Sequence, residues 1–156
     1  MRIISARDYD HMSRQAANII SAQVILKPNC VLGLATGGTP VGTYKQLVDW
    51  YNKGDLDFSE VTTVNLDEYR GLPKEHPESS WSFMHRNLFD LVNVRPEAIN
   101  LPDGTNMDAE AECARYDAVI KNVGASTCSC WASAMTATSA STSRARPLNW
   151  APTASP

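Results

Sequence analysis

The feature that most constrains the fold of this chain is a short apolar run that ends in two glycines. Residues 30–36 read CVLGLAT, and GGTP follows at once. A short apolar run bounded by turn residues is typical of a strand buried on both faces of a parallel sheet. Residues at helical spacing then predict a helix over 41–53, with Thr39 as its N-cap and Pro40 in its first turn. The sequence therefore predicts a strand, a glycine loop and a helix in succession.

The same alternation continues along most of the chain. Apolar residues at helical spacing predict helices over 8–26, 82–91 and 108–123, and β-branched residues predict a second strand over 61–66. Strands that alternate with helices indicate an α/β fold with a doubly wound, mostly parallel sheet of the Rossmann-like type. This order requires another buried strand after Gly124, where the last helix is predicted to end.

Residues 125–156 do not have the composition of such a strand. Twenty of these thirty-two residues are Ala, Ser or Thr, and Arg144 and Arg146 are the only charged ones. One interpretation is a natural, disordered tail of low complexity. The other is translation in a shifted reading frame. We expect residues 1–124 to be the N-terminal part of one domain, whose sheet is incomplete in this chain, and residues 125–156 to be an out-of-frame, disordered tail without a strand.

The genetic code allows the frame shift to be examined. If one base is lost near the Gly124 codon, each true codon combines the third base of one codon with the first two bases of the next. The single codons of Trp131 and Met135 then force a glycine and an aspartate. With permitted choices elsewhere, residues 126–145 read IDLQLLGIGNDGHIGFNEPG. This string is an apolar strand followed by a glycine-rich loop, as the alternation requires.

Charge and residue spacing exclude several classes of function. The formal net charge of −3 and the pI of about 5.5 leave no basic face for nucleic acid, and the three histidines lack the spacing of metal ligands. No segment approaches the length that spans a membrane, and the N-terminus lacks the apolar run of a signal peptide. We expect a cytoplasmic protein that binds a small molecule and has no metal, nucleic-acid partner or membrane association.

The glycine loop is the first candidate site. The backbone N–H groups of Gly37 and Gly38, the hydroxyls of Thr36 and Thr39 and the positive end of the following helix dipole suit a phosphate or another anion. A tight turn that Thr39 merely caps is the alternative, because short glycine loops are common.

Two adjacent acids form the second candidate site. Asp67 and Glu68 follow the second predicted strand, at the edge of the sheet where α/β proteins bind their ligands. A carboxylate in that place can move a proton on a bound substrate. Alternatively, Asp67 caps a turn and Glu68 is solvated. We interpret His76 and His85 as surface and packing residues rather than catalytic ones.

Three stretches of the sequence resemble a known family. LGLATGGTPVGTYKQLVDWY, VNLDEYRGLPKEHPESSWSFMHRNLFD and INLPDG are similar to glucosamine-6-phosphate deaminases, and the likeness covers residues 1–124. The resemblance implies conversion of glucosamine 6-phosphate to fructose 6-phosphate and ammonia, without a cofactor. It also implies that Asp67 is the base that moves a proton between C1 and C2. Thr36, Gly37, Gly38 and Thr39 match the phosphate-binding loop of the family, whose intact members form homo-oligomers in some cases.

The sequence also departs from this family. The ring-opening histidine of the family lies in a loop that resembles the restored string, and this chain has Thr136, Thr138 and Ser143 there instead. The resemblance therefore implies that the chain as given is inactive. Two other functions remain open: a 6-phosphogluconolactonase of the same fold, and a sugar-phosphate-sensing domain without enzymatic activity.

Overall fold

The structure is a computed structural model that describes residues 4–124 and 128–129. Its helices and strands alternate along the chain, as the sequence predicts. They are α1 (Tyr9–Leu26), β1 (Val31–Leu34), α2 (Val41–Asn52), β2 (Thr62–Asn65), α3 (Ser80–Asn87), β3 (Ile99–Asn100), α4 (Ala109–Val123) and β4 (Cys128–Ser129). Two short 3-10 turns, η1 (Phe89–Leu91) and η2 (Pro96–Ala98), lie between α3 and β3.

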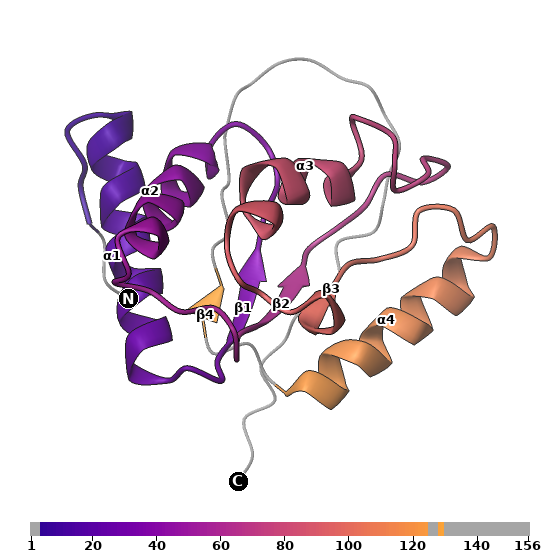
Figure 1. The fold of residues 1–156 in the computed structure, drawn as a ribbon. Helices are drawn as coiled ribbons and strands as arrows, with labels where there is room; N and C mark the ends of the chain where they lie inside the picture. Colours follow the sequence, from indigo (N-terminus) through magenta and orange to yellow (C-terminus); the bar gives the residue numbers. More distant parts are fainter. Residues whose placement is uncertain (1–3, 125–127, 130–156) are drawn as a thin grey trace, which may run out of the picture.

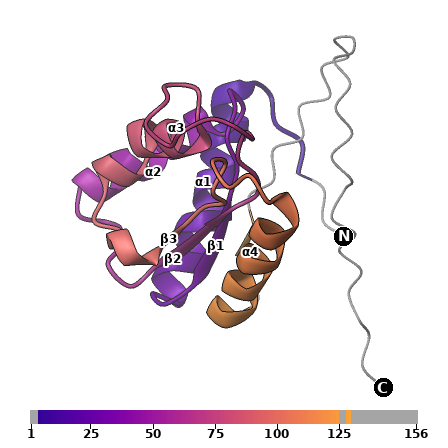
Figure 2. The same ribbon diagram turned by 90° about the vertical axis from the view of Figure 1, so that its right-hand side faces the viewer.

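The strands form one parallel sheet in the order β3-β2-β1-β4 (Figure 1). The chain moves from β1 to β2 to β3 in one direction and then returns to pair β4 with the other side of β1. As a result, the sheet lies between α2 and α3 on one face and α4 on the other (Figure 2). The predicted doubly wound α/β fold is confirmed.

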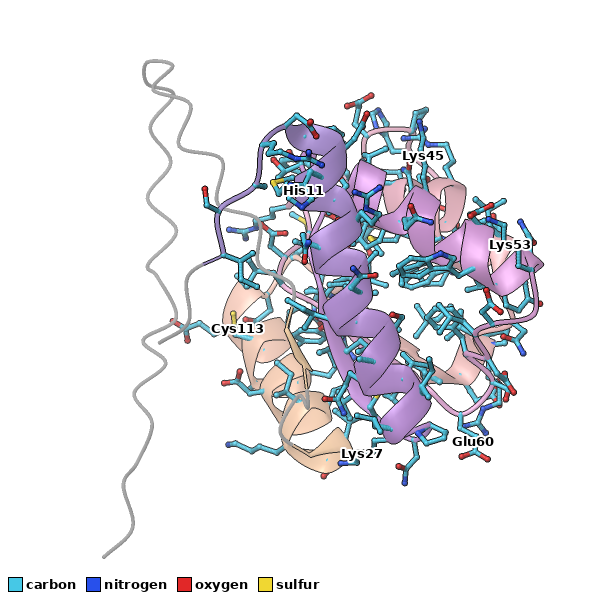
Figure 3. All side chains as sticks on the ribbon, turned by 90° about the vertical axis from the view of Figure 1, so that its left-hand side faces the viewer. His11, Lys27, Lys45, Lys53, Glu60 and Cys113 are labelled. Carbon is cyan, nitrogen blue, oxygen red and sulfur yellow. The ribbon has the colours of Figure 1, made fainter. Side chains whose placement is uncertain are left out.

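The core lies between β1 and the helices α1 and α2. Leu32 and Leu34 of β1 are 2% and 1% exposed, and Tyr44 and Leu47 of α2 are fully buried. The helix α1 packs against α2, and the two helices begin at the same end of the molecule, where His11 and Lys45 are labelled in Figure 3. These contacts place the loop after β1 against the start of both helices.

Two helices begin differently from the sequence prediction. The N-cap position of α2 is Pro40, and no side chain there bonds the helix, so the predicted N-cap at Thr39 is wrong. The helix α3 begins at Ser80 rather than at residue 82, because the Ser79 hydroxyl accepts the Ser82 N–H at 3.0 Å and caps the helix earlier. The N-cap of α1 is Asp8, whose carboxylate accepts the His11 N–H at 2.7 Å.

The strand β4 corrects one expectation. The alternation of elements requires a strand after Gly124, whereas the composition of residues 125–156 predicts none, and Cys128 and Ser129 do pair in parallel with Leu32 and Gly33 of β1. Strand pairing uses backbone groups, so the open edge of β1 can accept an extended segment whatever its side chains are. The rest of the predicted out-of-frame tail lies outside the described residues.

Candidate functional site

Both candidate sites follow strands that end at the same edge of the sheet. Leu34 and Asn65 are paired in the register of β1 and β2, so the glycine loop (residues 36–39) and Asp67 follow the carboxyl ends of two adjacent parallel strands. The order of the sheet reverses at β1, because β1 lies between β2 and the later strand β4. Ligands of doubly wound proteins bind outside the carboxyl ends of the strands at such a point. The topology therefore places both candidate sites at the ligand-binding edge of the sheet.

The glycine loop offers unpaired backbone donors. Gly37 and Gly38 are exposed, and the φ of Gly37 is +99°, a conformation that glycine adopts without strain. Within the described residues, the N–H groups of Gly37, Gly38 and Thr39 donate to no acceptor, and the hydroxyls of Thr36 and Thr39 make no hydrogen bond. Open donors beside the N-terminus of α2 are suited to an anion.

Two tyrosine hydroxyls hold this loop in place. The Tyr44 hydroxyl donates to the Ala35 carbonyl at 2.5 Å and accepts the Ala35 N–H at 3.2 Å, at the point where β1 ends. The Tyr9 hydroxyl, from the first turn of α1, donates to the Gly38 carbonyl and accepts the Gly42 N–H, both at 2.9 Å. The loop is therefore fixed at its start and across its junction with α2.

A third tyrosine fixes the end of β2 from the opposite face of the sheet. The Tyr116 hydroxyl of α4 accepts the Asn65 N–H at 3.0 Å and lies 2.7 Å from the Asn65 carbonyl and 3.1 Å from the Asn100 carbonyl, to which it can donate. Burial raises the pKa of Tyr116 to about 12, so the hydroxyl keeps its proton. We call Tyr9, Tyr44 and Tyr116 the tyrosine clamps.

Asp67 extends from the end of β2 with its carboxylate unbonded. The residue is exposed, and no hydrogen bond to its side chain occurs within the described part of the chain. Partial loss of water around the carboxyl, together with the negative charge of Glu68, raises the pKa of Asp67. A carboxylate with a raised pKa and free oxygens has the properties that a general base requires.

Glu68 has a different role. Its carboxylate accepts the N–H groups of Tyr69 and Ser80 at 2.8 Å and of Trp81 at 3.1 Å. Two of these donors are the first N–H groups of α3, which have no partner inside the helix. The alternative of a solvated Glu68 is therefore wrong. Glu68 anchors the polar loop after β2 to the start of α3.

Comparison with known proteins identifies the family. Residues 7–136 match the family described as glucosamine-6-phosphate isomerases/6-phosphogluconolactonase. The chain belongs to this family. It is 59% identical over 124 residues to a glucosamine-6-phosphate deaminase of Lachnoclostridium phytofermentans and 52% identical over 124 residues to that of Clostridium acetobutylicum. Each alignment covers 80% of this chain and 52% of the relative.

Solved structures agree with this assignment. A monomeric glucosamine-6-phosphate deaminase has a TM-score of 0.79 and 40% identity, over 81% of this chain and 52% of that one. A 6-phosphogluconolactonase of Thermotoga maritima, with a TM-score of 0.63 and 15% identity over 80% of this chain and 54% of that one, shares the fold. The chain thus spans about half the length of these members of the glucosamine-6-phosphate isomerase/6-phosphogluconolactonase family.

His85 packs against other side chains, and His76 makes a hydrogen bond within its own loop. His85 stacks on Trp81 with ring centroids 4.3 Å apart, and its Nδ1 lies 2.6 Å from an Asp90 oxygen. His76 accepts the Glu78 N–H at 3.1 Å within its own loop. Within the described residues, no group of His, Cys, Asp or Glu is placed to hold a metal ion, and no helix is long and apolar enough to cross a membrane.

The residues that sequence reasoning missed at this site are the tyrosine clamps and the capping role of Glu68. Tyr44 and Tyr116 occupy buried positions of helices, and a buried tyrosine hydroxyl needs a hydrogen-bond partner. That signal predicts a bond, but it does not say which backbone group receives it. Tyr9 is 46% exposed and gives no such signal. Thr136, Thr138 and Ser143, where the family has its ring-opening loop, lie outside the described residues.

Proposed function

We propose that this chain supplies the phosphate-binding loop and the proton-transfer base of a site that converts glucosamine 6-phosphate to fructose 6-phosphate and ammonia. The observation that carries this proposal is the exit of the glycine loop and Asp67 from adjacent parallel strands at one sheet edge. The loop has open N–H donors and Asp67 has an unbonded carboxylate. Relatives at 52% and 59% identity are named glucosamine-6-phosphate deaminases, which supports this reaction over others of the family.

Each group has a defined task in the reaction. The N–H groups of the glycine loop bind the phosphate and hold the sugar at one end. Asp67 accepts the proton from C2 of the opened sugar and returns a proton at C1, and its raised pKa makes it a stronger base than an ordinary aspartate. Water replaces the amine at C2, so the products are fructose 6-phosphate and ammonia.

We also propose that the chain as given lacks ring-opening activity because of a frame shift after about Gly124. The support is the change of composition at that point and the family-like loop that the restored frame would encode. Resequencing of the coding DNA from the Lys121 codon to the Arg146 codon, in the clone and in its source, tests this proposal. A restored base supports the frame shift, and the same sequence in both contradicts a cloning or sequencing origin.

The reaction is tested with the chain as given and with a frame-restored version. We expect ammonia release from glucosamine 6-phosphate by the frame-restored protein only. Asp67→Asn in that protein should lower kcat by at least about 100-fold, the contribution of a general base. Asp117→Asn, an exposed aspartate of α4, is the matched control and should retain activity.

Other outcomes would replace the proposal. Hydrolysis of 6-phosphogluconolactone without ammonia release would make the protein a lactonase. Binding of glucosamine 6-phosphate that is unchanged by Asp67→Asn, with no turnover in either protein, would favour a sensor, which needs the loop but not the base.

A further inference from the structure

The Tyr9 hydroxyl bridges two points on either side of Thr39. It donates to the Gly38 carbonyl and accepts the Gly42 N–H, both at 2.9 Å. Tyr9 is the first residue of α1 and lies far from both partners in the sequence. The hydroxyl therefore accepts one of the N–H groups at the start of α2 that have no partner inside the helix. Its bond to the Gly38 carbonyl also fixes the orientation of the peptide between Gly38 and Thr39.

The orientation of that peptide determines the direction of the next donor. The peptide bond is planar and trans, so the Gly38 carbonyl and the Thr39 N–H point in opposite directions. Because the Gly38 carbonyl points to the Tyr9 hydroxyl, the Thr39 N–H points away from that hydroxyl. Within the described residues, this N–H has no acceptor. Without the Tyr9 hydroxyl, a loop with two exposed glycines could turn this peptide over at little steric cost.

Close packing of α1 against α2 holds Tyr9 in this place. A Cβ atom at Gly42 would clash with the Ser13 Oγ and would lie 2.9 Å from the Tyr9 Cε1. Only glycine at position 42 lets the first turns of the two helices approach so closely, at the end of the molecule marked by His11 and Lys45 in Figure 3. The Asp8 cap fixes the first turn of α1. The ring of Tyr9 thus lies against Gly42 of α2, on a helix turn that Asp8 caps.

We propose that Tyr9 is a positioning residue that turns the Thr39 N–H toward the phosphate of a bound sugar phosphate. It acts through the backbone and does not touch the substrate. This inference rests on the proposed function, because that function places the phosphate at the glycine loop. It adds a residue of α1 to a site whose other members follow β1 and β2.

The test uses the full chain labelled with 15N and titrated with glucosamine 6-phosphate and, separately, with inorganic phosphate. Dissociation constants and the amide shift of Thr39 are compared among the unaltered protein, Tyr9→Phe and Tyr51→Phe. Tyr51 is the matched control, because its ring packs on Phe58 while its hydroxyl makes no hydrogen bond in the described part of the chain. We expect Tyr9→Phe to weaken binding by about tenfold, the effect of one misdirected hydrogen bond to a charged group.

The outcomes separate this inference from the proposed function. The inference is supported if Tyr9→Phe binds phosphate more weakly and its Thr39 amide no longer shifts on phosphate addition, while Tyr51→Phe binds like the unaltered protein. Equal binding by Tyr9→Phe overturns it and leaves the proposed function intact. Tighter binding also overturns it, since the hydroxyl would then merely occupy the Gly42 N–H in place of the ligand. Absence of binding by the unaltered chain overturns the proposed phosphate site and this inference with it.

Discussion

At the scale of single residues, Asp67 and Glu68 are adjacent carboxylates that the fold uses in opposite ways. Glu68 accepts three backbone N–H groups and holds the start of α3, whereas Asp67 makes no bond within the described residues and has a raised pKa. The sequence identifies both as candidates but does not separate them, because the distinction depends on where α3 begins. This difference leaves the carboxylate of Asp67, the proposed base, unbonded while Glu68 keeps the loop in place.

The raised pKa of Asp67 predicts an effect on stability. The folded state holds the proton of Asp67 more tightly than the unfolded chain does, so the stability gained is present below the ordinary aspartate pKa and is lost as pH rises through the raised value. Asp67→Asn should therefore increase the free energy of unfolding at neutral pH, with a gain that disappears below about pH 4. Urea unfolding at several pH values measures it.

The control for this prediction is an aspartate with the opposite shift. The Ser59 N–H and the Asn93 amide lower the pKa of Asp57. Asp57→Asn should therefore reduce stability at neutral pH, and the loss should shrink on acidification. If both substitutions change the free energy of unfolding in the same direction, the surroundings of Asp67 do not disfavour its charged form.

At the scale of elements, α4 is attached by a few polar contacts rather than by a broad apolar face. Glu112 and Tyr116 are its buried residues, whereas Ala111 and Ala114, which helical spacing marks as apolar, are exposed. Periodicity in the sequence shows that a helix has an apolar side, but it cannot show whether a partner covers that side. The Tyr116 hydroxyl bonds α4 to β2 and β3, and Glu112 bonds it to the loop that precedes the helix.

Removal of the Tyr116 hydroxyl should loosen α4 and the end of β2 together. Tyr116→Phe leaves the buried N–H of Asn65 without its partner, which we expect to reduce stability by about 2 kcal/mol. Amide hydrogen exchange should become faster at Asn65 and along α4 before it does so in β1. Tyr51→Phe serves as the control, and a similar loss there would contradict a specific role for the clamp.

Glu112 links α4 to the loop before it. Its carboxylate accepts the Asp103 N–H at 2.8 Å and pairs with the Arg115 guanidinium, which holds the pKa of Glu112 at about 2. The lowered pKa of Glu112 stabilises the folded chain above about pH 4.5, and this stabilisation is lost as the pH falls toward 2. Glu112→Gln should reduce stability at pH 7 by about 1–2 kcal/mol, and the difference from the unaltered chain should narrow below pH 4.5. A difference independent of pH would contradict this assignment.

At the scale of the whole molecule, the edge of β1 is paired with a short strand, β4. Within the described residues, Cys128 and Ser129 are the ones that pair with this edge, opposite Leu32 and Gly33. An uncovered strand edge offers unpaired backbone groups to other chains. The edge of β1 is therefore a place where association between copies can begin.

A chain that stops at Gly124 tests this view. We expect its free energy of unfolding to differ by less than about 1 kcal/mol from that of the full chain, because the core is retained. Sedimentation velocity at increasing concentration should show more self-association than for the full chain. A large loss of stability with no association would mean that the covering segment serves the core rather than the edge.

Much of this architecture follows from the sequence, because it depends on local patterns. The buried run of β1, the positive φ of Gly124 and the exit of Asp67 from a parallel sheet are set by residues close together in the chain. The tyrosine clamps and the cap of α3 by Glu68 join residues that are distant in sequence, and no local pattern encodes them. The pairing of β4 joins backbone groups of Cys128 and Ser129 to the edge of β1, which is distant in sequence.

The tyrosine clamps have a consequence for how quickly a ligand is captured. Ordering a free loop on arrival of a ligand removes about 1–2 kcal/mol of backbone entropy for each residue. Here the backbone at Ala35, Gly38 and Asn65 is already held by side chains from three helices, so that entropy is lost during folding and not during binding. The backbone at this edge of the sheet is therefore fixed before any ligand arrives, and we expect the proposed phosphate site to bind without an ordering step in the loop.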